Sequence, residues 1–175
     1  HTILSRTLKV TNFVHNYNVC EWGIKRNRQN FTDYLLHSGK QNIMTGTITF
    51  SIIKPNVVLK DKVGELISMI EAAGYTVQAL KKIRLTEQTA GEFYKEHQGK
   101  EFFERLVKFM ISGPIYVMIL EKENAVTDFR ALIGSTNPVE AEDGTIRKKF
   151  ADDKTANAVH GSDSDENAQK EAAFF

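Results

Sequence analysis

The chain of 175 residues, 41% of them hydrophobic, is long enough to bury the core of one globular domain. A formal net charge of +1 argues against a generally basic nucleic-acid binder, and a single cysteine, Cys20, excludes an internal disulfide and a multi-cysteine zinc site. No apolar run approaches the roughly 20 residues of a membrane span, and no secretory signal pattern opens the sequence, so we expect a cytoplasmic protein without a membrane partner.

The first 43 residues differ in composition from the remainder. They carry six basic and two acidic residues without a sustained hydrophobic period, whereas the remainder carries 17 basic and 20 acidic residues. Met44 directly precedes the first convincing strand, so we expect residues 44–175 to form the domain and residues 1–43 to be an extension, disordered or not native to it. A basic arm for nucleic acid or membranes is the alternative, but only diffuse charge supports it, and we expect no specific nucleic-acid partner.

Hydrophobic periodicity predicts the first elements of the domain. Residues 47–53 alternate apolar and polar side chains, which is typical of a half-buried strand. Apolar residues then recur at helical spacing over residues 63–70, and Gly74 marks where this helix ends. Residues 75–80 predict a second strand.

Two helical stripes follow, over residues 90–97 and 103–110. Residues 114–120 are almost continuously apolar, as expected of a strand covered on both faces, so we expect this strand to lie centrally. Residues 125–133 predict a further helix, and residues 158–160 are the only later ones that predict a strand.

A long polar connection, residues 135–157, precedes this last strand. Loops of this length inside a domain are usually functional or disordered, and Thr136, Arg147 and Asn157 favour a function. The complete order is strand, helix, strand, helices, strand, helix, loop, strand. It predicts an α+β sandwich with helices on one or both faces of the sheet.

The segment NAVHGSDS, residues 157–164, places one imidazole, His160, at the end of a short apolar run and in a small polar turn. Neutral imidazole is a good nucleophile near pH 7, since its unperturbed pKa is about 6.5. The neighbouring Gly161 removes a side chain that would block an incoming group. The pattern therefore predicts a reactive histidine.

Any phosphate ligand of this chain must be held by side chains, because neither a P-loop nor a Rossmann glycine motif is present. Lys54 supplies a point charge, and Arg130 and Arg147 offer planar forks that match phosphate oxygens. Each cation taken alone is more simply a solvated surface group. Spacing along the chain does not establish that the three converge.

From Thr47 onward the chain resembles the nucleoside diphosphate kinases. The motifs that carry the resemblance are FSIIKPN (50–56), FYKEH (93–97), SGP (112–114), RALIGSTNP (130–138), GTIR (144–147) and NAVHGSDS (157–164). Several motifs in one order make the resemblance specific. It implies a ferredoxin-like βαββαβ fold, an antiparallel sheet sandwich with surrounding helices.

The resemblance also implies a ping-pong reaction, in which His160 takes the γ-phosphoryl group from ATP or another nucleoside triphosphate and passes it to a nucleoside diphosphate. The phosphohistidine enzyme would maintain NTP and dNTP pools. Mg²⁺ would be carried in by the nucleotide phosphates, with no direct protein ligand. The family assembles as homo-oligomers, and we expect a hexamer, with a tetramer as the alternative.

Each matching residue inherits an expected role. The nucleotide-binding positions are Lys54, Phe102, Leu106, Arg130, Thr136, Arg147 and Asn157. The catalytic positions are His160, Lys54, Tyr94 and Glu171, with Gly161 and Ser162 in support. Glu171 would fix the imidazole through its second nitrogen, and Ser162 would support this carboxylate. Each of these three residues also has an ordinary structural interpretation: Tyr94 as a core tyrosine, Glu171 as a helix-surface glutamate and Ser162 as an N-cap serine.

Phe102 matches the aromatic residue that stacks on the base, which would make the enzyme tolerant of many bases. Helical spacing places Phe103 in the core and leaves Phe102 freer to face a ligand. Lys154 stands where the family commonly has an apolar residue on the other side of the base, and Thr155 replaces a frequent glycine or aspartate. Base affinity is therefore expected to differ from the family's pattern.

Two other functions compete with the enzyme. A regulatory nucleotide-binding module would keep the fold without turnover, but such a module has no need of the nucleophile His160 or of intact phosphate binders. Nucleic-acid binding through the basic first 43 residues would require a salt-dependent interaction that is lost on trimming to Met44.

Overall fold

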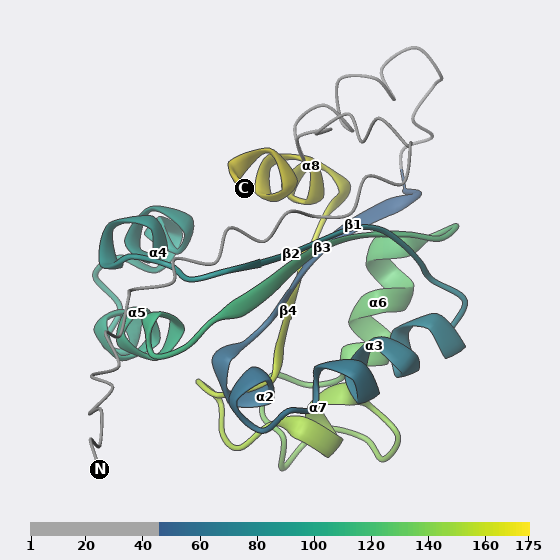
Figure 1. The fold of residues 1–175 in the computed structure, drawn as a ribbon, viewed down its shortest axis with the longest axis horizontal. Coiled ribbons are helices and arrows are strands. Elements are labelled where there is room, and N and C mark those ends of the chain that lie inside the picture. The colour runs from purple at the N-terminus through teal and green to yellow at the C-terminus, as the bar shows by residue number, and fades with distance from the viewer. Residues whose placement is uncertain (1–45) are drawn as a thin grey trace, which may run out of the picture.

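The structure is a computed structural model that describes residues 46–175, and a four-stranded antiparallel sheet lies at its centre (Figure 1). The strands are β1 (Ile48–Ile53), β2 (Thr76–Ile83), β3 (Ile115–Glu121) and β4 (Val159–Gly161). Their spatial order is β2-β3-β1-β4, in which β1 pairs with β3 and β4, and β2 pairs with β3. This order confirms the predicted α+β, ferredoxin-like fold.

Helices cover both faces of the sheet (Figure 1). One face carries α2 (Pro55–Leu59), α3 (Val63–Ala72), α6 (Ala125–Ile133) and α7 (Ile146–Phe150). The other carries α4 (Glu87–Phe93), α5 (Phe103–Ile111) and α8 (Asp165–Phe174), with a single 3₁₀ turn, Lys95–His97, between α4 and α5. The sheet is therefore the middle of three layers.

The two cores of the domain meet at β3. Val117 and Ile119 point into the core formed with α4, α5 and α8, whereas Met118 and Leu120 point into the core formed with α3 and α6. All four side chains are fully buried. The prediction of a central strand covered on both faces is thus confirmed, because successive side chains of a strand face opposite sides.

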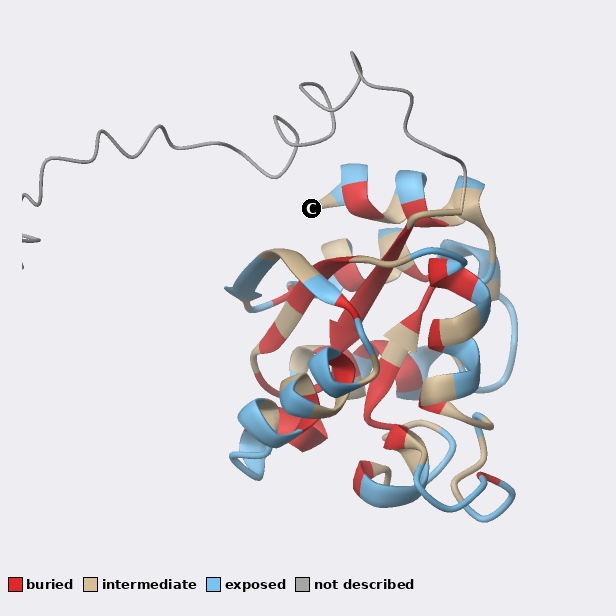
Figure 2. Ribbon diagram, turned by 90° about the vertical axis from the view of Figure 1, so that its right-hand side faces the viewer, coloured by how far each residue is buried: buried red, intermediate tan, exposed pale blue. Residues whose placement is uncertain are grey.

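The prediction of a half-buried β1 was wrong. Its polar residues Thr49 and Ser51 are as buried as Phe50, and β1 belongs to the buried centre of Figure 2. Helix α6 packs against β1 and covers the face that carries the hydroxyl groups. The Ser51 hydroxyl is satisfied there by donating to the backbone carbonyl of His160 at 2.8 Å.

Residues 135–157, predicted as a long polar connection, also contain a helix and buried apolar residues. They contain α7, and Ala141, Ile146 and Phe150 are buried. The sequence also missed α2, which directly follows β1. Its first residue is Pro55, whose fixed φ and missing N–H suit the first position of a helix.

The remaining predicted elements are confirmed with small shifts. Helix α3 ends at Ala72, two residues before Gly74, whose φ of +86° suits glycine. Strand β2 extends beyond the predicted residues 75–80 and contains a bulge between Val77 and Ala79. Within residues 46–175, no helix is long and apolar enough to cross a membrane. The prediction for residues 1–43 lies outside the described residues.

Candidate active site

A cavity of about 500 Å³ lies at the end of β1 and β4. Every predicted site residue except Ser162 lines it: Lys54, Tyr94, Phe102, Leu106, Arg130, Thr136, Arg147, Asn157, His160, Gly161 and Glu171. They come from both helical layers and from the loop before β4. The fold therefore brings together residues that sequence spacing alone could not place in one site.

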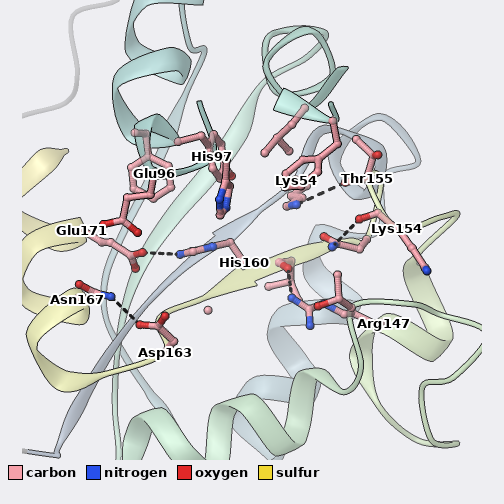
Figure 3. A pocket seen from close by; sticks show the side chains of 18 of the residues that line it. Lys54, Glu96, His97, Arg147, Lys154, Thr155, His160, Asp163, Asn167 and Glu171 are labelled. Atoms are coloured by element: carbon pink, nitrogen blue, oxygen red, sulfur yellow. Dashed lines mark hydrogen bonds and ion pairs between the residues drawn. The ribbon is translucent and has the colours of Figure 1, made fainter. Parts of the chain in front are cut away.

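His160 occupies the middle of this cavity, on β4 opposite Ile52 of β1. Its Nε2 lies 3.0 Å from Oε1 of Glu171, as the dashed line in Figure 3 shows. The hydroxyl of Ser162 donates to Oε2 of the same carboxylate at 2.5 Å. A carboxylate only accepts, so in the neutral imidazole Nε2 is the nitrogen that carries the proton and Nδ1 the one that keeps its lone pair. Nδ1 makes no hydrogen bond with the described residues.

Ser162 and Glu171 are not the ordinary surface groups that the sequence left as alternatives. Ser162 is fully buried, and the N-cap of α8 is Ser164, whose hydroxyl accepts from the backbone N–H of Asn167 at 3.2 Å. The Glu171 side chain is 20% exposed and turned into the cavity. The N-cap interpretation of Ser162 and the helix-surface interpretation of Glu171 were therefore wrong.

The packing of the core gives a second reason for glycine at position 161. A Cβ at this position would lie 2.8 Å from Cδ1 of Phe129 and 3.3 Å from Cδ1 of Ile133, both of them core residues. The missing side chain thus makes room for the core beneath β4. That it also clears the approach to His160 stays a prediction.

A γ-turn centred on Ala158 leads into β4. Ala158 has a φ of +68°, and the backbone N–H of Val159 donates to the carbonyl of Asn157 at 2.8 Å. A non-glycine residue in this conformation costs roughly 1–3 kcal/mol. The carbonyl of Ala158 accepts from the backbone N–H of Lys54 at 2.9 Å. The strained turn therefore ties the loop before His160 to the end of β1.

Lys54 is a buried cation with little to neutralise it. Its side chain is 5% exposed, and within residues 46–175 its Nζ reaches only the backbone carbonyl of Thr155, at 3.5 Å. Burial first, and next the charge of Arg147, lower the pKa of Lys54 from 10.5 to about 7, although Asp153 acts in the opposite direction. Among the described residues the ammonium therefore has no ion-pair partner, which an anionic ligand would supply.

Arg147 links the C-terminal end of α6 to the first residue of β4. Its guanidinium donates to the carbonyl of Gly134 at 2.8 Å and to that of Val159 at 3.1 Å. Burial, followed by the charge of Arg130, lowers the pKa of Arg147 to about 10. Figure 3 shows Lys54 and Arg147 on the side of His160 opposite Glu171, and Arg130 lines the same cavity.

Three buried polar atoms of the lining lack a hydrogen-bond partner within residues 46–175. They are Oη of Tyr94, Nε of Arg147 and Oδ1 of Asn157. Buried polar groups are almost always paired, so such a cluster in one cavity indicates a polar ligand. Tyr94 is buried, and its ring meets the imidazole of His160 edge-on at 6.5 Å.

Comparison with known proteins decides the family. Residues 47–175 match the family model described as nucleoside diphosphate kinase. Two relatives of that name, from Chlorobium limicola and Prosthecochloris aestuarii, are 58% and 59% identical over 127 residues, which is 73% of this chain and 91% and 90% of theirs. The chain belongs to the nucleoside diphosphate kinase family. It is accordingly a phosphotransferase with nucleoside diphosphate kinase activity, and the resemblance found in the sequence is confirmed.

Solved nucleoside diphosphate kinases share the fold. The enzyme of Aquifex aeolicus matches with a TM-score of 0.71 and 40% identity, covering 73% of this chain and 93% of that one. The enzyme of Encephalitozoon cuniculi, crystallised in the apo form, matches with a TM-score of 0.71 and 32% identity, covering 74% and 88%.

The cavity of this nucleoside diphosphate kinase also contains residues that the sequence did not single out. They include a second imidazole, His97, the carboxylates of Glu96 and Asp163, and the cation Arg105. His97 was interpreted as part of the helical stripe 90–97, but it lies in the 3₁₀ turn, and its ring lies 5.4 Å from that of Phe102. Its place in the FYKEH motif was the available signal.

The aromatic wall of the cavity agrees with the expected division between two phenylalanines. Phe102 directly precedes α5, is 40% exposed and lines the cavity. Phe103 instead packs against the core of α4 and α5. A partly exposed ring beside buried Leu106 leaves a flat apolar face toward the cavity.

Proposed function

We propose that this enzyme transfers the γ-phosphoryl group from ATP or another nucleoside triphosphate to a nucleoside diphosphate by way of a phosphohistidine at Nδ1 of His160. The observation that carries the proposal is the bond between Nε2 of His160 and Glu171. It leaves Nδ1 as the nucleophilic nitrogen, in a cavity lined by Lys54, Arg130 and Arg147.

The two half-reactions balance without any other reactant. Nδ1 forms a bond to the γ-phosphorus while the bond from that phosphorus to the bridging oxygen breaks, and the nucleoside diphosphate leaves. The ring, still protonated at Nε2, becomes cationic, and the carboxylate of Glu171 stabilises this charge. A terminal oxygen of the second diphosphate then attacks the same phosphorus, and Nδ1 leaves.

The cations and orphaned polar atoms of the cavity support the expected roles in binding. Lys54 and Arg147 would neutralise the polyphosphate, together with Arg130 and Thr136. The unpartnered Oδ1 of Asn157 can accept from a sugar hydroxyl. Tyr94 would position the imidazole as a buried edge-on neighbour. A bound phosphate would also supply the negative charge that the buried ammonium of Lys54 lacks, and would thereby lower the free-energy cost of burying it.

Mg²⁺ would enter as part of the nucleotide substrate. This ion typically keeps several waters and binds through substrate phosphates, so it needs no all-protein cage. Phe102 and Leu106 would hold the base by stacking and apolar contact, which accepts every base. The reaction would thus serve the NTP and dNTP pools in general.

We further propose a homo-oligomer, hexameric rather than tetrameric, built on residues 44–175 as the kinase domain. Strand β2 supports self-association, because it forms one edge of the sheet over eight residues and exposes 47% of Leu80. A cytoplasmic location suits the single cysteine of the chain.

The proposal is tested by separating the two half-reactions. Protein treated with γ-labelled ATP and Mg²⁺ should, after removal of nucleotide, retain about one acid-labile, base-stable phosphate per chain, and GDP should then release the label as GTP. Phosphorus–nitrogen correlation by NMR should assign the phosphate to Nδ1.

The matched variants are His160→Ala and His97→Ala, which remove one or the other imidazole of the same cavity. The label should be absent from the first and retained by the second. Labelling of His160→Ala, or attachment at Nε2 in the unmodified enzyme, would contradict the mechanism. Nucleotide binding without any label would favour a regulatory module.

A further inference from the structure

Two cations of the cavity have no part in the proposed phosphate chemistry. Arg105 and Lys154 both line the cavity, and both are exposed. Within residues 46–175, neither side chain forms an ion pair or a hydrogen bond; only the backbone carbonyl of Lys154 is engaged, by Nδ2 of Asn157. Both charges are therefore available to a ligand.

Arg105 lies on the same side of the cavity as the proposed base platform. It is three residues beyond Phe102 and adjacent to Leu106, and residues three and four apart share one face of a helix. The platform thus presents an apolar ring and a buried leucine with a guanidinium beside them.

Lys154 approaches from the loop between α7 and β4. Figure 3 shows its side chain extending away from His160, so its ammonium lies at the end of the cavity remote from the reacting nitrogen. A nucleotide whose terminal phosphate reaches His160 places its base, and not its phosphates, toward that end. The charge of Lys154 therefore acts on the outer part of the ligand.

The carboxylate of Asp153 offsets these charges only in part, because within residues 46–175 it forms no ion pair with either cation. Its Oδ1 accepts from the backbone N–H groups of Thr155 and Ala156 at 2.6 Å and 2.8 Å, which fix it within its own loop. Those backbone bonds lower the pKa of Asp153, and the charges of Arg105 and Lys54 lower it further. Arg105 is thus close enough to act electrostatically across the cavity without forming an ion pair.

We propose that Arg105 and Lys154 bias the base site toward bases that present a carbonyl oxygen where adenine and cytosine present an amino group. The inference rests on the proposed function, because it concerns the same nucleotide. Guanine offers the adjacent acceptors O6 and N7, which match a guanidinium, whereas adenine replaces O6 with a donor. Uracil likewise has the carbonyl oxygen O4 where cytosine has the N4 amino group.

We expect the preference for oxo bases to be small, because stacking provides a contribution to binding that is the same for every base. Stacking on Phe102 accepts every base, and the two cations are exposed, so water and salt weaken their contacts. We expect kcat/KM for oxo bases to exceed that for amino bases by about three- to tenfold at low ionic strength. The ratio should fall as salt is added.

The test uses phosphorylated enzyme and varies only the acceptor. Rates of dephosphorylation by GDP, IDP, ADP, UDP and CDP are measured by rapid quench. IDP keeps the 6-oxo group of guanine but lacks its 2-amino group, so it should behave like GDP. Arg105→Ala and Lys154→Val should each reduce the GDP/ADP and UDP/CDP ratios, and the double variant should bring both close to one.

The matched control is Lys108→Ala, which removes an exposed cation of α5 that does not line the cavity and should leave the ratios unchanged. Equal rates for GDP and ADP in the unmodified enzyme would overturn the inference. So would variants that slow every acceptor equally, because the cations would then act on phosphate and not on the base. Failure to form phosphoenzyme at all would instead refute the proposed function.

Discussion

Replacing Lys54 with methionine should stabilise the ligand-free enzyme while abolishing nucleotide binding. The residue is 5% exposed, and within the described chain its ammonium has no ion-pair partner. A pKa that falls from 10.5 to about 7 corresponds to about 5 kcal/mol that the folded protein loses by keeping this lysine charged. Methionine has a similar volume and removes that cost, so we expect a gain of about 2–5 kcal/mol at pH 6.

The sign of the pH dependence follows from the direction of the shift. Below about pH 7, Lys54 is protonated in both the folded and the unfolded state, and the full cost is present. Between about pH 7 and 10.5, the unfolded chain binds more protons than the folded protein, so the wild-type free energy of unfolding rises by about 1.4 kcal/mol per pH unit from this group. The advantage of Lys54→Met should therefore shrink as the pH rises above 7.

The assay is urea unfolding of both proteins, without nucleotide, at pH 6, 7, 8 and 9. The difference between the two free energies isolates Lys54 from every other titrating group. Lys108→Met, an exposed lysine, serves as the control and should show no such difference. If Lys54→Met is no more stable than wild type at pH 6, or if its advantage is constant up to pH 9, the account of Lys54 as an uncompensated buried charge is wrong.

Three further substitutions test neighbouring features. Gly161→Ala should destabilise the fold by about 1–3 kcal/mol in urea unfolding, because its Cβ would meet the Phe129 ring at 2.8 Å, and Phe129→Leu should restore part of that loss. Glu171→Gln should lower kcat by about 10- to 100-fold with little change in KM, since a hydrogen bond to a charged group is worth roughly 1.5–3 kcal/mol; an unaltered kcat would remove its orienting role. Arg147→Ala should lower kcat/KM by an amount equivalent to about 2–4 kcal/mol, and an unchanged value would exclude phosphate stabilisation by this guanidinium.

The sequence predicted most of the fold because its periodic segments are long and unambiguous. Residues 114–120 and 125–133 became β3 and α6 almost to the residue. Burial was harder to predict where polar side chains pack inside. Thr49 and Ser51 marked an exposed face by composition, yet α6 covers that face.

The site could be predicted only in part from physical reasoning. The pattern around His160 indicated a reactive imidazole, but the approach of Lys54 and Arg147 is a property of the tertiary fold and came from the family resemblance. The residue type alone also gave a wrong alternative for the N-cap of the last helix. Ser162 and Ser164 are equally plausible helix caps, and only the backbone path through β4 decides that Ser164 fills this role.

The order in which the chain is synthesised gives β4 a special importance. β1 lies inside the sheet, yet its outer edge is completed only by Val159–Gly161, more than 100 residues later. A nascent chain that has not reached these residues exposes an apolar strand edge, the kind of edge that recruits other chains. Premature termination before β4 should therefore yield insoluble product and not merely an inactive enzyme. The ribosome-bound intermediate should also depend on chaperone protection until the last fifth of the domain has emerged.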